Sequence, residues 1–232
     1  EFAPMSGHKL FEIVQAAVQR SGLSPQCSRL PTDDTNVHVL TGSYHILVSQ
    51  NSNPLSAGGF AGCLPQPITK MMMPDADKRV AMHAANSFVT IGKGMPVPEG
   101  AREFVDKIMG DSQSFTTWED AKRAMELCYY LSRQLLANNK ALAVHWCPSD
   151  HLVSSDFFVQ AGSGKTLTPL LVRPYLFSSA NQLRKGLPVG MVGNGSQYLL
   201  GRPVVFKEAQ VDATWMIQRV ANFIDMCHMR GA

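Results

Sequence analysis

Residues 117–146 read TWEDAKRAMELCYYLSRQLLANNKALAVHW, and two patterns in this stretch decide the fold class. Across 117–137 an apolar residue recurs every three or four positions, which is the period of an amphipathic helix. Thr116 and Glu119 have the spacing of a capping box and predict its start. The short apolar run 141–146 follows and predicts a strand at the centre of its sheet.

The rest of the chain contains further segments with the patterns of helices and of strands. Segments 8–20 and 211–229 repeat the helical period, whereas 37–49 alternates apolar and polar residues as strands do, with a turn at Thr41-Gly42-Ser43. Further extended segments are expected at 85–91, 167–177, 187–192 and 203–207, with Pro169 and Pro174 placing 167–177 at a sheet edge. Because helices and strands do not alternate strictly, we predict an α+β fold. Its mixed or mostly antiparallel sheet is packed by the helices at 8–20, 117–137 and 211–229.

The chain divides most naturally at the Gly/Pro-rich segment 92–100. We therefore expect an N-terminal half at 5–95 and a C-terminal half at 100–232, or one interleaved domain built from both. Glu1-Phe2 ahead of Met5 resembles a cloning remnant, so we expect residues 1–4 to lie outside the fold.

Composition excludes several classes of protein. Among 232 residues, 45% are hydrophobic and 17% are charged, which predicts a folded core and excludes wholesale disorder. The net charge of +3 has no basic cluster, so we expect no nucleic-acid partner. No apolar run is long enough to span a membrane, and no signal peptide is visible, so we expect no membrane partner. The five scattered cysteines form no CxxC motif, which favours free thiols in the cytoplasm.

A glycine-rich stretch, AGSGKT at 161–166, resembles the end of a phosphate-binding loop. The candidate phosphate-binding residues are Gly162, Gly164, Lys165 and Thr166. The first glycine of the motif is replaced by Val159, and Pro169 disfavours the helix that should follow. We prefer the interpretation that this stretch is a turn, and keep a nucleotide-binding enzyme as an alternative.

A second cluster, HWCPSDH at 145–151, brings together a thiol, imidazoles and a carboxylate. Cys147 could act as a nucleophile with His145 or His151 as its base, and Asp150 is a further candidate catalytic residue. His145, Cys147 and His151 are also metal-ligand types. Neither site has identifiable partners elsewhere in the chain, so we prefer a strand followed by a turn, and we expect no metal and no cofactor. A cysteine-dependent hydrolase centred on Cys147 remains an alternative.

The sequence ALAVHWCPSDHLVSSDFF (141–158) resembles a bacterial domain family of unknown function. The strand near Leu170, the glycine-rich segment 186–195 and YLLGRPVVF (198–206) follow in the same order, and VAMHAANSFVTIGKG (80–94) is similar to an earlier strand. The resemblance covers roughly residues 37–229. The family has no established activity. The resemblance implies that Gly162–Thr166 lies in a connection whose sequence varies.

With no complete catalytic motif, we expect a non-enzymatic module that binds another protein, of the immunity, adaptor or regulatory type. The Gly/Pro-rich segment 51–67 is a candidate contact surface. Trp215 and Phe223 on the last helix predict a homodimer.

Overall fold

The structure is a computed structural model that describes residues 3–23, 26–30, 34–94, 115, 117–162, 166–179 and 186–230. The chain forms two compact units. The first contains Glu1–Leu55 and His83–Lys140, and the second contains Ser56–Met82 and Ala141–Ala232. This grouping differs from the halves 5–95 and 100–232 that the sequence suggested, because each unit takes in a segment from the other half.

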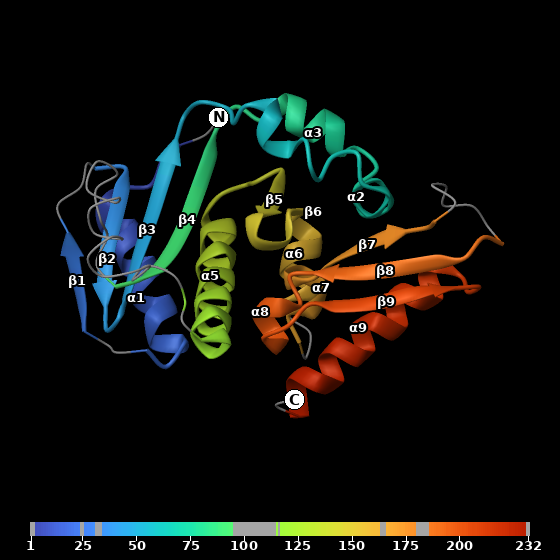
Figure 1. Ribbon diagram of the computed structural model, residues 1–232. Helices are drawn as coiled ribbons and strands as arrows, with labels where there is room; N and C mark the ends of the chain where they lie inside the picture. The colour runs from blue at the N-terminus through green and yellow to red at the C-terminus, as the bar shows by residue number, and fades with distance from the viewer. Residues whose placement is uncertain are drawn as a thin grey trace, which may run out of the picture. The chain divides into compact units, whose positions relative to one another are not determined.

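The first unit is built on a four-stranded antiparallel sheet in the order β1-β2-β3-β4 (Figure 1). Its strands are β1 (Cys27–Leu30), β2 (Asn36–Thr41), β3 (Tyr44–Asn51) and β4 (Asn86–Lys93). The expected turn joins β2 to β3 through Gly42, whose φ of 56° is easily adopted by glycine.

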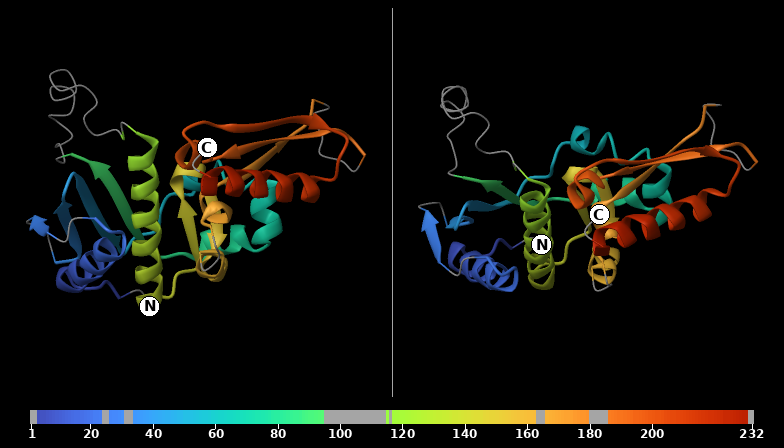
Figure 2. Two further views of the ribbon diagram at one scale, coloured as in Figure 1. Left: turned by 90° about the horizontal axis from the view of Figure 1, so that it is seen from below. Right: turned by 60° about the horizontal axis from the view of Figure 1, so that its bottom comes forward.

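Two helices, α1 (Gly7–Arg20) and α5 (Trp118–Asn138), pack on this sheet (Figure 2). Their apolar residues share one core with the alternating buried positions of β2 and β3. Ser6 caps α1 by accepting a hydrogen bond from the Lys9 amide over 3.3 Å. The cap of α5 is Thr117, which accepts from the Asp120 amide. The prediction of Thr116 as the cap was therefore wrong by one residue.

The second unit contains a β-hairpin and a three-stranded antiparallel sheet. The hairpin joins β5 (Ala143–Trp146) to β6 (His151–Ser154), and the sheet has the order β7-β8-β9. The sheet strands are β7 (Arg173–Phe177), β8 (Val189–Asn194) and β9 (Val204–Ala209). The edge position predicted for 167–177 is confirmed for β7, but the extended conformation was wrong for 168–171, which form the short helix α7 (Thr168–Leu171). The prediction that 141–146 forms a central strand was wrong, because β5 pairs with β6 alone among the described strands.

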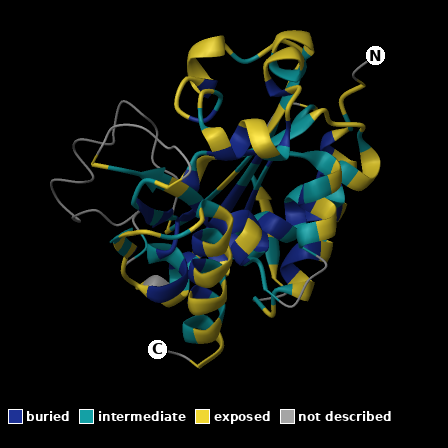
Figure 3. Ribbon diagram, turned by 90° about the vertical axis from the view of Figure 1, so that its right-hand side faces the viewer, coloured by how far each residue is buried: buried dark blue, intermediate teal, exposed yellow. Residues whose placement is uncertain are grey.

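The second unit also contains seven short helices and one long helix among its described residues. The short ones are η1 (Ala57–Phe60), α2 (Pro67–Met72), α3 (Ala76–Met82), η3 (Cys147–Ser149), α6 (Ser155–Ala161), α7 (Thr168–Leu171) and α8 (Gln197–Leu200). The long helix α9 (Ala213–Arg230) packs against β8. It buries Met216, Val220 and Ile224 and leaves Trp215 and Phe223 exposed. Figure 3 shows the buried and exposed parts of the chain, with exposed residues along the last helix before the C-terminus.

The α+β fold with antiparallel sheets is thus confirmed, as are the three amphipathic helices at 8–20, 117–137 and 211–229. Within the part of the chain that the structure describes, no helix combines the length and the apolar composition that a bilayer crossing requires.

Candidate functional site

The tight loop between β5 and β6 brings three of the candidate residues together. β5 ends at Trp146, and Cys147-Pro148-Ser149 then forms a single 3-10 turn. The turn closes through a hydrogen bond from the Asp150 amide to the Cys147 carbonyl over 3.0 Å. Four loop residues therefore reverse the chain and return the Asp150 side chain to the neighbourhood of His145.

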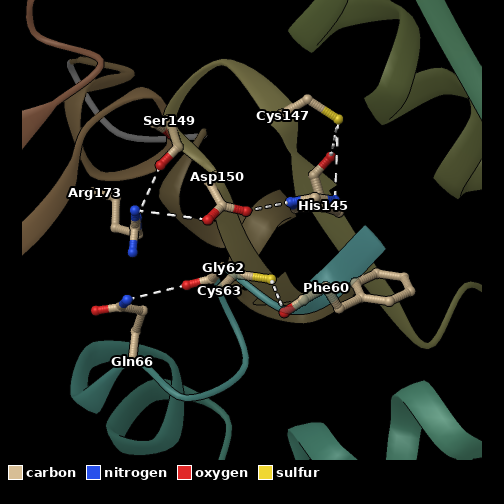
Figure 4. Close-up of polar contacts among 9 residues, drawn as sticks. All are labelled: Phe60, Gly62, Cys63, Gln66, His145, Cys147, Ser149, Asp150 and Arg173. Carbon is tan, nitrogen blue, oxygen red and sulfur yellow. Dashed lines mark hydrogen bonds and ion pairs between the residues drawn. The ribbon is translucent and has the colours of Figure 1, made fainter. Parts of the chain in front are cut away.

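His145 lies between Asp150 and Cys147 (Figure 4). Its Nε2 is 2.9 Å from Asp150 Oδ1, and its Nδ1 is 4.0 Å from Cys147 Sγ. The Asp150 carboxylate accepts a hydrogen bond from Nε2–H, which leaves Nδ1 free to accept a proton from the thiol. Cys147 is exposed, so its sulfur is accessible to a substrate. The three side chains have the arrangement of a nucleophile, a base and a residue that orients the base.

The electrostatics of these groups favour a thiolate paired with an imidazolium. Contacts with Cys147, then Cys63, then Asp150 raise the pKa of His145 to about 10, against an opposing effect of burial. The hydrogen bond with His145 lowers the pKa of Cys147, again against burial. A thiol next to a cationic imidazole is more reactive than an isolated one, because the thiolate is the nucleophilic form.

Asp150 occupies a left-handed backbone conformation, with φ of 51° and ψ of 45°. Asp is one of the residues that adopt this conformation most readily, although it still carries some strain. Arg173, a buried residue at the start of β7, holds the loop in place. Its Nε donates to the Ser149 carbonyl over 2.8 Å, and its guanidinium lies 3.7 Å from Asp150 Oδ2.

Cys63 reaches the same site from a distant part of the sequence. It follows η1, is fully buried, and its thiol donates to the Phe60 carbonyl over 3.4 Å. Its side chain also interacts with His145. The approach is close, because a Cβ on the adjacent Gly62 would overlap the Asp150 carboxylate. Sequence reasoning missed both Cys63 and Arg173, since neither lies in a recognisable motif.

His151, the alternative base, lies elsewhere in the hairpin. It is 1% exposed, and its Nδ1 is 3.3 Å from the Leu170 carbonyl. Burial is the main cause that lowers the pKa of His151 to about 4. Arg173 and His145 lower it further, whereas Leu170 and Asp150 oppose the shift. Among the described contacts, His145 and not His151 is the imidazole next to Cys147.

Burial of neutral His151 makes folding sensitive to acid. Because the pKa falls from 6.5 to about 4 on folding, its contribution is complete above pH 6.5 and is lost as the pH falls through 4. We expect the wild-type free energy of unfolding to fall by about 3 kcal/mol more than that of His151→Gln between pH 7 and pH 4. Urea unfolding at both pH values measures the difference, and equal losses in the two proteins would contradict it.

The candidate phosphate-binding residues do not form a described site. Ser163, Gly164 and Lys165 lie outside the described residues. Gly162 ends helix α6, and the next helix, α7, starts only after Thr166 and has four residues. A phosphate-binding loop instead joins a strand to a helix long enough to provide a dipole.

One mixed group of potential metal ligands occurs among the described residues: Cys63, His145 and Asp150. The sequence suggested the ligand set His145, Cys147 and His151. Only His145 is common to the two sets, and Cys63 and Asp150 replace Cys147 and His151. No protein-family model, no curated protein and no solved structure matches the chain. The family resemblance described above stays an expectation.

Proposed function

We propose that the protein is a cysteine-dependent enzyme that hydrolyses or transfers an acyl group. The observation that carries the proposal is the geometry at the β5–β6 loop, where an exposed Cys147 contacts His145 and His145 in turn contacts Asp150. Among the three functions that the sequence left open, this one uses side chains that lie within contact distance of one another.

The reaction would proceed in two steps. The Cys147 proton moves to His145 Nδ1, and the sulfur attacks the carbonyl carbon of an ester, thioester or amide. As the bond to the leaving group breaks, His145 returns the proton to that group and a thioester remains on Cys147. Water then attacks the thioester, with His145 taking its proton, and the free thiol is restored. Asp150 keeps the His145 ring in position and stabilises its cationic form.

The test uses 4-nitrophenyl acetate, an activated acyl donor that needs no specific recognition. We expect a burst of nitrophenol and acetylation of Cys147, located by peptide mass spectrometry. The Cys147→Ser variant should lose both signals. The matched control is Cys227→Ser, which removes a half-buried thiol from α9 in the same unit. Acetylation of Cys147 no faster than that of Cys227 would refute the proposal.

The non-enzymatic alternative, binding of another protein, stays a prediction, and so does the homodimer. Trp215 is 47% exposed and Phe223 is 40% exposed, so both are accessible for contact on α9. Phe223 nevertheless has an intramolecular partner, since its ring packs edge-to-face on Phe206 with the ring centres 5.8 Å apart.

A further inference from the structure

We propose that Cys63, His145 and Asp150 form a binding site for a divalent cation of the zinc type, and that occupancy of this site blocks the proposed cysteine catalysis. The inhibitory part rests on the proposed function, because it requires His145 to serve Cys147. The binding part rests only on the three ligands and their positions.

The ligand atoms converge from separate parts of the chain. One potential ligand atom from each residue lies within 4.8 Å of those from the other two. Cys63 comes from the turn after η1, His145 from β5, and Asp150 from the end of the loop that follows it. Zinc ligands lie about 2.0–2.3 Å from the ion, so shifts of about 1 Å would bring all three donors into range.

The three ligands differ in their exposure to solvent. Cys63 is fully buried, and the side chains of His145 and Asp150 are 19% and 34% exposed. The site is therefore closed on the Cys63 side and reachable from solvent on the Asp150 side. Three protein ligands leave a fourth position for water or another small ligand, as in open zinc sites.

The chemistry of the ligands selects the class of metal. One thiolate, one imidazole and one carboxylate are a ligand set for zinc, whereas magnesium and calcium prefer oxygen ligands alone. Binding requires the loss of the Cys63 thiol proton and of the His145 Nε2 proton, and both are released to solvent. The hydrogen bond from that thiol to the Phe60 carbonyl would be lost at the same time.

Occupancy of the site would remove the base that the proposed reaction needs. The nitrogen that faces Asp150 is Nε2, so the metal would bind there and leave the remaining ring proton on Nδ1. Nδ1 is the atom next to Cys147 Sγ, and once protonated it cannot accept the thiol proton. Asp150 would also bind the metal instead of orienting His145.

The binding test uses cobalt as a spectroscopic probe, added to the full chain after treatment with a chelator. We expect an absorption band from charge transfer between thiolate and cobalt, and we expect zinc to displace it. The band should persist in Cys147→Ser and in the control Cys27→Ser, a half-buried thiol of the first unit. Cys63→Ser should abolish it, and His145→Gln should weaken cobalt binding by about 100-fold or more. The His145 variant tests the site independently of any effect of Cys63→Ser on folding.

The inhibition test compares acetylation of Cys147 by 4-nitrophenyl acetate with zinc and with a chelator. In the wild type we expect zinc to slow acetylation by about tenfold or more. The zinc concentration that gives half-maximal inhibition should equal the zinc dissociation constant obtained by cobalt displacement. In Cys63→Ser the ratio of the two rates should approach one. Acceleration by zinc would overturn the inhibitory role.

The two proposals fail in different ways. Absence of the cobalt band in the wild type, its retention in Cys63→Ser, or its loss in Cys147→Ser would overturn the metal site, whatever the acetylation rate. Absence of Cys147 acetylation in the presence of chelator would overturn the proposed function and the inhibition that depends on it. The cobalt band would still support metal binding by itself.

Discussion

Replacing His145 with alanine is expected to slow acetylation of Cys147 by 4-nitrophenyl acetate by about 100-fold or more at neutral pH. His145 is the imidazole in contact with the sulfur, and its loss removes both the proton acceptor and the cation that stabilises the thiolate. Chelator-treated protein is used so that a bound metal does not contribute. The measurement is the burst rate of nitrophenol release, with acetylated Cys147 quantified by mass spectrometry.

His8→Ala is the control for this experiment, because the His8 side chain is 80% exposed on α1 in the other unit. It should acetylate at the wild-type rate. Addition of free imidazole should partly restore His145→Ala, whereas it should not restore Cys147→Ser. Asp150→Asn should give a smaller loss than His145→Ala, because Asp150 orients the base and does not touch the sulfur. A His145→Ala variant with wild-type acetylation would remove His145 from the mechanism.

The largest expected effect on stability comes from Phe158→Ala. Phe158 is fully buried in α6, and its ring centre lies 6.3 Å from that of Trp146, the residue between His145 and Cys147. Removing the ring leaves a cavity beneath β5, which should lower the free energy of unfolding by about 4 kcal/mol. For a chain of this size the thermal midpoint should fall by about 10 °C.

Val159→Ala is the matched control, since Val159 neighbours Phe158 in the same helix but is 39% exposed. Its free energy of unfolding should change by no more than about 0.5 kcal/mol. Differential scanning calorimetry of the three proteins provides the comparison. Equal midpoints for the two variants would show that α6 does not support the hairpin in the way the packing indicates.

The candidate site could be recognised from the sequence only in part. His145, Cys147 and Asp150 lie within six consecutive residues, so their proximity was foreseeable. The relative orientation of the three side chains was not foreseeable, because it depends on the 3-10 turn and on the positive φ of Asp150. A backbone conformation that is unusual for a non-glycine residue is hard to predict from local propensity, since surrounding contacts have to stabilise it.

Two residues of the site could not have been foreseen. Cys63 and Arg173 contact the loop only after distant segments have packed together, and no periodic pattern encodes such contacts. The erroneous prediction that 141–146 forms a central strand has the same origin. An apolar run predicts burial, but only Trp146 of β5 is buried, and Leu142 just before the strand is 41% exposed, because β5 pairs with β6 alone among the described strands.

The sequence by itself determined the three amphipathic helices, the β2–β3 hairpin and the edge position of β7. These features follow from patterns that extend over only a few residues. The spacing of apolar residues indicates whether a segment is a helix or a strand, and proline, which lacks an amide hydrogen, cannot donate to a neighbouring strand on that side. Only the tertiary structure decided that Ser56–Met82 belongs with Ala141–Ala232 and that Cys63 lies beside His145. Such contacts between distant segments form wherever burial of apolar surface offsets the entropy of closing long loops, and that balance is a property of the whole unit.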